Sequence, residues 1–220
     1  MLQALLFDCD GIIADSEAHW NQIDREHLAA FGVPDYTGHL KEHIIGTSFA
    51  HSIGFYREQF DIAAPLAEMI AHRTEVAAKF YAEQIPIYPN TRETLEQCRA
   101  LNLKMAVATS SVGRLIRPFL KRHDIEKYFD FIVTGEQVEN GKPHPDIYLK
   151  AAAGVQTDPA HCLVIEDALA GLESGRAAGA RTVALPDARW LDVVQFEGKS
   201  DFKIEQLSEL VPLVKRLMAD

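Results

Sequence analysis

Residues 4–17 read ALLFDCDGIIADSE, an apolar run that stops at two acidic residues. The segment from Leu2 to Phe7 is short, apolar and ended by polar residues, a pattern that predicts a buried β-strand. Asp8 and Asp10 therefore stand at the carboxyl end of that strand. Two carboxylates in this place suit either a solvated turn or a site for a cation and an anion. The remainder of the chain has to distinguish these two interpretations.

Helical segments follow this stretch, and no alternation typical of strands occurs between Asp15 and Gln84. Ser16 is the expected N-cap of the first helix. The prolines of IPIYPN, residues 85–90, indicate a linker. We therefore predict an all-helical cap domain over residues 15–84, inserted into a core domain made of residues 1–14 and 85–220. The expected cap helices span residues 16–31, 48–60 and 65–84.

Strands and helices alternate after the linker. Short apolar strands separated by helices predict a parallel sheet that is covered on both faces. The predicted fold class is α/β, with a Rossmann-like parallel sheet core, helices on both faces and the inserted all-helical cap. The glycines Gly171, Gly175 and Gly179 recur at every fourth position, which predicts close packing of one helix on the sheet. The expected strands span residues 103–109, 131–134, 162–165 and 181–185, and the expected helices residues 91–101, 112–123, 146–154, 168–178 and 204–218.

The composition is that of an ordinary globular chain: of 220 residues, 47% are hydrophobic and 25% are charged. The formal net charge of −10 argues against nucleic acid and anionic membranes as partners, because both require a basic face. A small anionic substrate stays compatible with this charge, because a few local cations or a metal can reverse the field in one cleft.

The three cysteines, Cys9, Cys98 and Cys162, are odd in number and lack metal-ligand spacing. They favour a reducing, cytoplasmic setting over a disulfide framework. The N-terminus has no basic region and its apolar run ends at Asp8, which is not the pattern of a signal peptide. No apolar run approaches the ~20 residues of a transmembrane helix. We expect a cytoplasmic protein that works as a monomer, with a dimer as the alternative.

Polar side chains follow four of the predicted strands. In an open parallel sheet, ligands bind at the carboxyl ends of the strands. Each group alone is more typical of a turn, a helix cap, a solvated lysine or an acidic helix start. Together and in this order, the carboxylates suit Mg²⁺, while the hydroxyls, the backbone N–H groups at a helix N-terminus and the ammonium suit a phosphate. The groups are Asp8 and Asp10, Thr109, Ser110 and Ser111, Lys142, and Glu166 and Asp167.

This ordered set resembles the motifs of the haloacid dehalogenase superfamily, specifically of its β-phosphoglucomutase-like phosphatases. The chain has FDCDG where that family has Asp-x-Asp-Gly, and VATSS where it has a Thr or Ser after the second core strand. It has GKPHPD for the lysine loop and IEDALAG for the paired acids before a small-residue helix. The resemblance covers essentially the whole chain, including the helical cap. Ala168 departs from the family pattern, which commonly has Ser after the acid pair.

The resemblance implies a Mg²⁺-dependent enzyme in which Asp8 is the nucleophile and forms an aspartyl phosphate. Asp10 would protonate the leaving alkoxide and then activate water as a base. The implied Mg²⁺ site consists of Asp8, Asp10 through its backbone carbonyl, and Asp167, with Glu166 as a neighbour. The implied phosphate-binding groups are Thr109, the backbone N–H of Ser110, and Lys142.

The cap is expected to close over the core and to select a small phosphorylated metabolite. Mutase members of the family carry a His two turns after the first motif and an Arg near a cap Gly. Here His19 lies one residue short of the expected position, and no Arg occurs in TSFAHS after Gly46. Hydrolysis of a small phosphate ester, such as a sugar phosphate, is therefore the first expectation. The cap side chains that could reach a substrate are Glu17, His19, His51 and Arg73, together with His43 and Arg57.

Three other classes stay open at this point. A phosphomutase of the β-phosphoglucomutase type would use the same aspartyl phosphate and would require a bisphosphate. A haloacid dehalogenase shares the fold and the nucleophile, but it needs neither a metal nor the second acids, Asp10 and Asp167. A non-enzymatic, phospho-accepting receiver domain also uses aspartates, a hydroxyl and a lysine, but it lacks a helical insert of this size.

Overall fold

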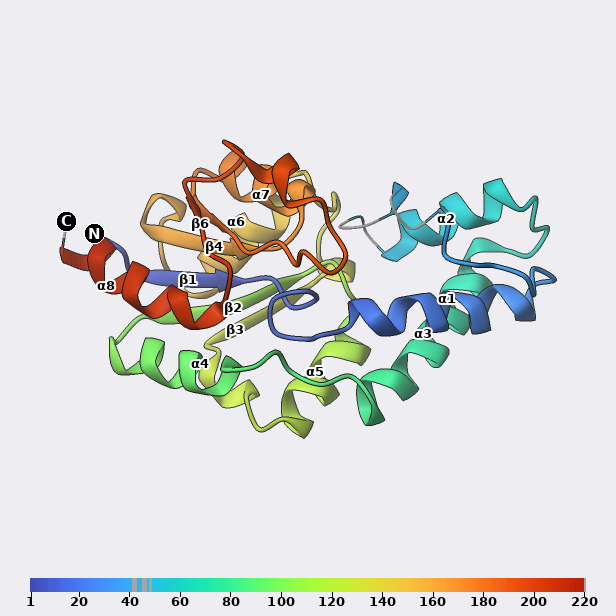
Figure 1. The fold of residues 1–220 in the computed structure, drawn as a ribbon, viewed down its shortest axis with the longest axis horizontal. Helices are drawn as coiled ribbons and strands as arrows, with labels where there is room; N and C mark the ends of the chain where they lie inside the picture. Colours follow the sequence, from blue (N-terminus) through green and yellow to red (C-terminus); the bar gives the residue numbers. More distant parts are fainter. Residues whose placement is uncertain (41–42, 45–46, 48, 220) are drawn as a thin grey trace.

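A computed structural model describes residues 1–40, 43–44, 47 and 49–219. Within this part of the chain, the core is a parallel sheet with the strand order β3-β2-β1-β4-β5-β6 (Figure 1). The α/β class and the parallel sheet are therefore confirmed. The strands are β1 (Ala4–Phe7), β2 (Lys104–Thr109), β3 (Phe131–Thr134), β4 (Cys162–Glu166), β5 (Arg181–Ala184) and β6 (Phe202–Lys203).

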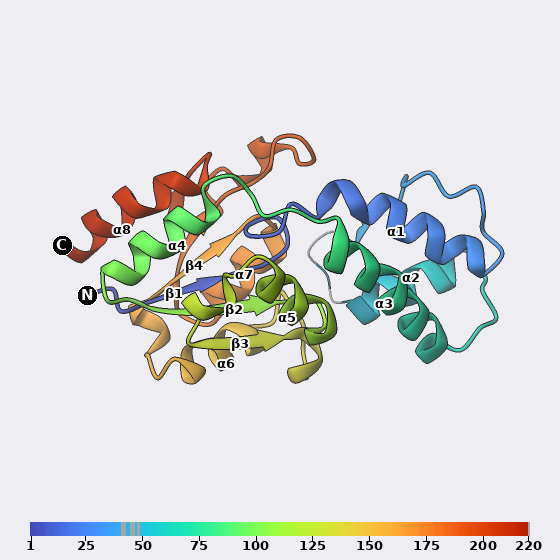
Figure 2. The same ribbon diagram turned by 90° about the horizontal axis from the view of Figure 1, so that it is seen from below.

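Helices cover both faces of this sheet. Figures 1 and 2 show α6 (Asp146–Gly154) and α7 (Leu169–Ala177) on one face, and α4 (Thr91–Ala100), α5 (Gly113–Arg122) and α8 (Leu210–Ala219) on the other. Successive residues of a strand point to opposite faces. Leu5 and Phe7 accordingly join the apolar cluster beneath α4, α5 and α8, whereas Ala4 and Leu6 join the cluster beneath α6.

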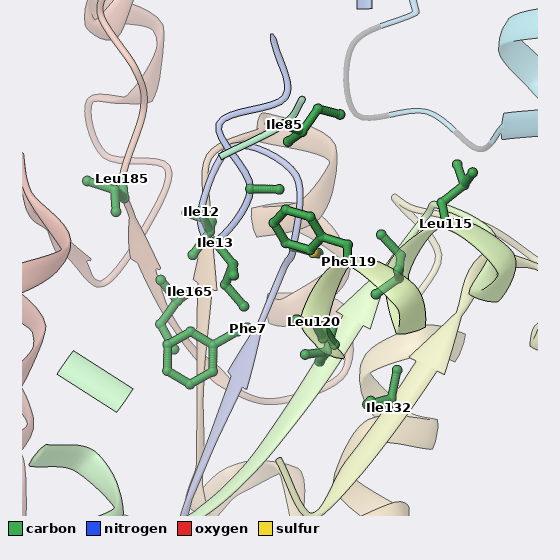
Figure 3. Close-up of a cluster of buried hydrophobic side chains, with 14 of the residues drawn as sticks. Phe7, Ile12, Ile13, Ile85, Leu115, Phe119, Leu120, Ile132, Ile165 and Leu185 are labelled. Carbon is green, nitrogen blue, oxygen red and sulfur yellow. The ribbon is translucent and has the colours of Figure 1, made fainter. Parts of the chain in front are cut away.

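The larger apolar cluster also fixes the turn that follows β1. Ile12 and Ile13 are fully buried in it, close to Phe119 of α5 (Figure 3). Gly11 has a φ of +82°, a left-handed conformation that glycine adopts at little cost. Buried apolar side chains thus precede and follow Gly11 in the sequence. They hold rigidly the stretch of backbone that carries Asp8 and Asp10.

Helices α1 (Glu17–Ala30), α2 (Phe49–Gln59) and α3 (Leu66–Glu83) lie beyond the carboxyl ends of the strands (Figure 2). The two chain segments that connect them to the sheet run side by side. Asp15 donates its N–H to the carbonyl of Pro86 at 3.0 Å, and Tyr88 donates to Ile13 at 2.9 Å. We propose that the cap begins and ends at these segments, as the predicted division at residues 15–84 requires.

Several expected boundaries differ from the structure. Ser16 precedes α1 but its hydroxyl does not cap the helix, because it donates to Asp10 instead. Thr109 ends β2, and α5 begins only at Gly113, so Thr109 is not at a helix N-terminus. The second cap helix was expected from Ser48, which lies outside the described residues. The short strand β6 was missed, because two residues carry no periodic pattern.

Cys9, Cys98 and Cys162 are buried free thiols. Among the described residues, none of the helices combines the length and the apolar character required to cross a bilayer.

A pair of histidines links α1 and α3. His27 is fully buried, and its Nδ1 lies 3.2 Å from Nδ1 of His72. Burial, with the nearby charge of Arg73, lowers the pKa of His27 to about 3. The folded state therefore keeps His27 neutral, while the unfolded chain binds a proton below pH ~6.5. The contribution of His27 to stability is complete above that pH and is lost as the pH falls toward 3.

We expect the variant His27→Gln to show a shallower loss of unfolding free energy between about pH 6.5 and 4 than the wild type. Urea titrations at a series of pH values measure this slope. The matched control is His144→Gln, which removes an exposed histidine in place of a buried one. This variant is expected to keep the wild-type slope. Parallel slopes for His27→Gln and the wild type would contradict the prediction.

Candidate active site

A cavity of about 110 Å³ lies between the strand ends and the cap helices. It brings together all of the predicted core-domain residues and two of the predicted cap residues, Glu17 and Arg73. The predicted core residues in its lining are Asp8, Asp10, Thr109, Ser110, Lys142, Glu166 and Asp167. Ser111 and Ala168, which the sequence places beside the predicted residues, also line the cavity. The other described lining residues were not predicted, and they are Trp20, Asp24, Ile44, Thr47, Phe49 and Ser52.

Lys142 joins the ends of the three central strands. The register places Phe7 level with Val107 and Ile165, so Asp8 is level with Ala108 and Glu166. The Lys142 ammonium donates to all three of these residues: to Asp8 Oδ1 at 2.6 Å, to Glu166 Oε1 at 2.6 Å and to the Ala108 carbonyl at 3.1 Å. Its side chain is only 3% exposed, so these charge-assisted bonds are shielded from water.

Burial and the charges around Lys142 together set the protonation behaviour of the site. Burial raises the pKa of Asp8 to about 8; the Lys142 charge opposes this rise and the Glu166 charge adds to it. Burial alone would lower the pKa of Lys142, but the Asp8 and Glu166 carboxylates raise it above its usual value. Lys142 is therefore a permanent cation between two acidic side chains.

Glu166 is held by donors on both of its oxygens. Oε1 accepts from Lys142 and from the Tyr148 hydroxyl at 2.6 Å, and Oε2 accepts from the backbone N–H groups of Asp167 and Ala168 at 3.1 and 3.2 Å. Gly171 of α7 packs directly against this carboxylate, because a Cβ there would lie 1.9 Å from Oε1. The close approach of α7 to the sheet, predicted from the glycine spacing, is confirmed at this position.

Three buried carboxylates could hold a metal ion. One oxygen each from Asp8, Glu166 and Asp167 lies within 4.8 Å of the others. Burial raises the pKa of Asp167 well above its usual value, and the negative charges of Glu166 and Asp8 raise it further. Lys142 balances only one of these three acids, so a divalent cation would relieve the remaining repulsion. Hard oxygen ligands of this kind fit Mg²⁺.

The Asp10 carboxylate is held by three hydroxyl groups from three parts of the chain. Oδ1 accepts from Ser16 at 2.7 Å and also from Tyr81 of α3, and Oδ2 accepts from Ser111 at 2.7 Å. Tyr81 was not predicted, Ser111 was expected at this edge of the sheet without a contact to Asp10, and Ser16 was expected to cap a helix. Tyr81 lies 71 positions from Asp10, so no spacing rule could have indicated it. Asp10 is thus in contact with the core domain through Ser111 and with the cap through Ser16 and Tyr81.

Thr109 ends β2 and Ser110 follows it, and both line the cavity. Thr109 is 1% exposed, and its hydroxyl oxygen accepts from the N–H of Ser111 at 3.1 Å. The Ser110 hydroxyl is buried and has no hydrogen-bond partner among the described residues. A buried polar atom without a partner is costly, so this hydroxyl is suited to an oxygen of a bound ligand.

The predicted cap residues differ in their positions. Arg73 is buried and forms an ion pair with Asp24 at 2.6 Å. His19 packs edge-on against Phe80, and His51 is exposed; neither is among the described lining residues. Arg57 donates to the Ala64 carbonyl at 2.9 Å. His43 packs on the ring of Phe55, and Gly46 lies outside the described residues.

Comparison with known proteins identifies the class. Residues 5–185 match the family of haloacid dehalogenase-like hydrolases. Since this match spans most of the chain, the protein belongs to that family and is a hydrolase. The alternative of a non-enzymatic receiver domain is therefore wrong.

The individual relatives narrow the class. The chain is 33% identical over 178 residues to the phosphorylated carbohydrates phosphatase of Thermotoga maritima, covering 81% of this chain and 82% of the relative. It is 26% identical over 208 residues to hexitol phosphatase B of Escherichia coli K12, covering 94% and 93%. The solved structure of a candidate β-phosphoglucomutase from Thermotoga maritima superposes with a TM-score of 0.76 at 29% identity, covering 98% and 99%. The resemblance to β-phosphoglucomutase-like phosphatases is confirmed.

Proposed function

We propose that the protein is a Mg²⁺-dependent phosphatase that hydrolyses a monophosphate ester of a sugar or a related small metabolite through an aspartyl phosphate on Asp8. The observation that carries this proposal is the arrangement of Asp8 beside Lys142, with Asp10 held next to it by hydroxyl groups. The names of two relatives, a phosphatase of phosphorylated carbohydrates and a hexitol phosphatase, support the substrate class.

In the first step, a carboxylate oxygen of Asp8 attacks the phosphorus atom as the bond from phosphorus to the substrate oxygen breaks. Asp10 donates its proton to that leaving oxygen, so that a neutral alcohol departs. In the second step, Asp10 takes a proton from water, and the water oxygen attacks the phosphorus of the aspartyl phosphate. Inorganic phosphate leaves, and Asp8 is restored.

Lys142, the backbone N–H of Ser110 and the Thr109 hydroxyl would balance the charge on the transferring phosphoryl oxygens. Glu166 positions the Lys142 ammonium, and its own oxygens are taken up by protein donors. Asp8, Asp167 and the backbone carbonyl of Asp10 would hold Mg²⁺, with Glu166 as a neighbour. When bound, Mg²⁺ would keep Asp8 ionised and neutralise negative charge on the phosphoryl group.

The test is phosphate release from a panel of sugar phosphates, polyol phosphates, phosphorylated sugar acids and nucleotides, with Mg²⁺ or with EDTA. Release that requires Mg²⁺ from one group of substrates would support the phosphatase. A phosphomutase would release little phosphate and would isomerise a sugar phosphate once a bisphosphate is added. Halide release from a haloacid without Mg²⁺ would instead indicate a dehalogenase.

Metal binding has its own expected effect on stability. Mg²⁺ should raise the thermal midpoint, because it neutralises buried carboxylates that repel one another in the folded protein. At a free concentration of 100 times Kd, the expected gain is about 2.7 kcal/mol. Differential scanning fluorimetry with Mg²⁺ and with EDTA measures the shift, and Asp167→Asn is expected to reduce it. An identical midpoint under both conditions at millimolar Mg²⁺ would contradict the assigned metal site.

A further inference from the structure

The cap end of the cavity is built around Arg73. Its guanidinium carbon lies 4.8 Å from the ring centroid of Trp20 and 4.8 Å from that of Phe49. Arg73 Nη1 donates to the Ser52 hydroxyl at 2.8 Å. Arg73, Trp20, Phe49 and Ser52 all line the same cavity as Asp8. The two rings contact each other edge-to-face, with centroids 6.2 Å apart, and the guanidinium packs against both. These contacts, with the bond to Ser52, hold it rigidly, so its direction is set before any ligand arrives.

Asp24 already balances the charge of Arg73. Asp24 Oδ1 accepts from Arg73 Nε at 2.8 Å and lies 2.6 Å from Nη2, while Oδ2 accepts from the Tyr56 hydroxyl at 2.8 Å. The two charged side chains are 5% and 2% exposed. Because Asp24 is fixed by both oxygens, it cannot swing away to release Arg73 for another anion. The ion pair therefore presents a polar but electrically neutral surface.

From this neutral pair we propose that the cap end of the site selects monophosphate esters whose far end is an uncharged, hydroxyl-bearing group, and that it disfavours a second phosphate or a carboxylate there. The inference rests on the proposed phosphatase function and specifies its substrate class as sugar or polyol monophosphates.

Arg73 supplies the attractive part of this selection. A guanidinium has five N–H groups, more than its contacts to Asp24 and Ser52 occupy. The remaining N–H groups donate to a substrate hydroxyl, while the rings of Trp20 and Phe49 contact the carbon chain. The Asp24 carboxylate supplies the repulsive part, because it opposes any anion that approaches Arg73.

Binding to the Asp8→Asn variant with Mg²⁺ tests the inference without turnover. Calorimetry compares sorbitol 6-phosphate, 6-phosphogluconate and sorbitol 1,6-bisphosphate, which share one carbon skeleton but end in a hydroxyl, a carboxylate or a phosphate. We expect affinity to fall along this series, with the bisphosphate at least about tenfold weaker than the monophosphate. Equal affinities, or tighter binding of the bisphosphate, would overturn the inference.

The variant Asp24→Asn, made in the same Asp8→Asn background, tests the origin of the selection. It leaves the charge of Arg73 unbalanced, so the ratio of bisphosphate to monophosphate affinity is expected to rise at least about tenfold. Asp35→Asn removes an exposed cap carboxylate and should leave the ratio unchanged. If Asp24→Asn does not fold, the comparison of the three ligands on the Asp8→Asn variant, which keeps Asp24, still tests the inference. If the three ligands bind in the expected order but the wild-type protein releases no phosphate, the proposed phosphatase function is refuted, while the inferred selection against a second anion is retained.

Discussion

Replacing Asp8 with asparagine is expected to lower the rate of phosphate release by at least about 10⁴-fold. The amide has nearly the same shape but is not a nucleophile at neutral pH. Lys142 keeps its contacts to Glu166 and to the Ala108 carbonyl, so the variant should still fold. Steady-state assays with the best substrate of the panel measure the loss, and thermal unfolding checks the fold. Full activity in a folded Asp8→Asn protein would refute Asp8 as the nucleophile.

The variant Asp10→Asn separates the two chemical steps. A p-nitrophenolate leaving group is a weak base and needs no proton from Asp10, so transfer of the phosphoryl group to Asp8 should continue. Hydrolysis of the aspartyl phosphate still requires a base, so phosphorylated protein should accumulate with p-nitrophenyl phosphate. Mass spectrometry of acid-quenched protein would show one added phosphoryl group. The double variant Asp8→Asn/Asp10→Asn is the control, and phosphorylation of that protein would place the nucleophile elsewhere.

Replacing Gly171 with alanine is expected to lower kcat/KM about 10²-fold or more, although no catalytic side chain is changed. The new Cβ would stand 1.9 Å from Glu166 Oε1. Glu166 is tied by donors on both oxygens, so it can move only by releasing some of them, and Lys142 would then shift relative to Asp8. Overpacking of this kind also costs about 1–3 kcal/mol of stability.

Gly54 provides the matched control for this variant. It lies within α2, and a Cβ there would meet nothing within 4 Å among the described atoms. Gly54→Ala should raise stability by up to about 1 kcal/mol, because alanine favours a helix over glycine, and should leave kcat/KM unchanged. Both variants place an alanine in a helix, but only Gly171→Ala adds an atom against Glu166. The difference between them therefore measures the effect of that contact. Wild-type kcat/KM in Gly171→Ala would show that Glu166 does not position Lys142.

Local patterns were sufficient to predict the core of the fold. The expected strand over residues 131–134 and the expected helix over residues 146–154 match β3 and α6 residue for residue. A buried parallel strand is a short apolar run, and its end is marked by the first polar residue, so strand ends can be located from sequence. Because parallel strands end at one edge of the sheet, the residues after them gather there. The grouping of Asp8, Lys142 and Glu166 follows from this geometry.

The cap side of the cavity could not be predicted in the same way. The Arg73–Asp24 ion pair joins residues 49 positions apart, and the Tyr81–Asp10 contact joins residues 71 positions apart. Helical periodicity indicates which side of α1 or α3 is apolar, but not which polar residues meet when the helices pack. Ser16 shows the same limit, since its sequence context favours a helix cap while the folded chain offers it Asp10.

The order of the motifs along the chain was enough to establish the family, the parallel α/β core and the chemical types that meet at the strand ends, because these depend on residue type and local period. Only the packing of the folded chain joined Asp10 to the Tyr81 and Ser111 hydroxyls and neutralised Arg73 with Asp24. Such contacts arise between segments far apart in the sequence, where the free energy of burying a polar group selects its partner only after the chain has folded.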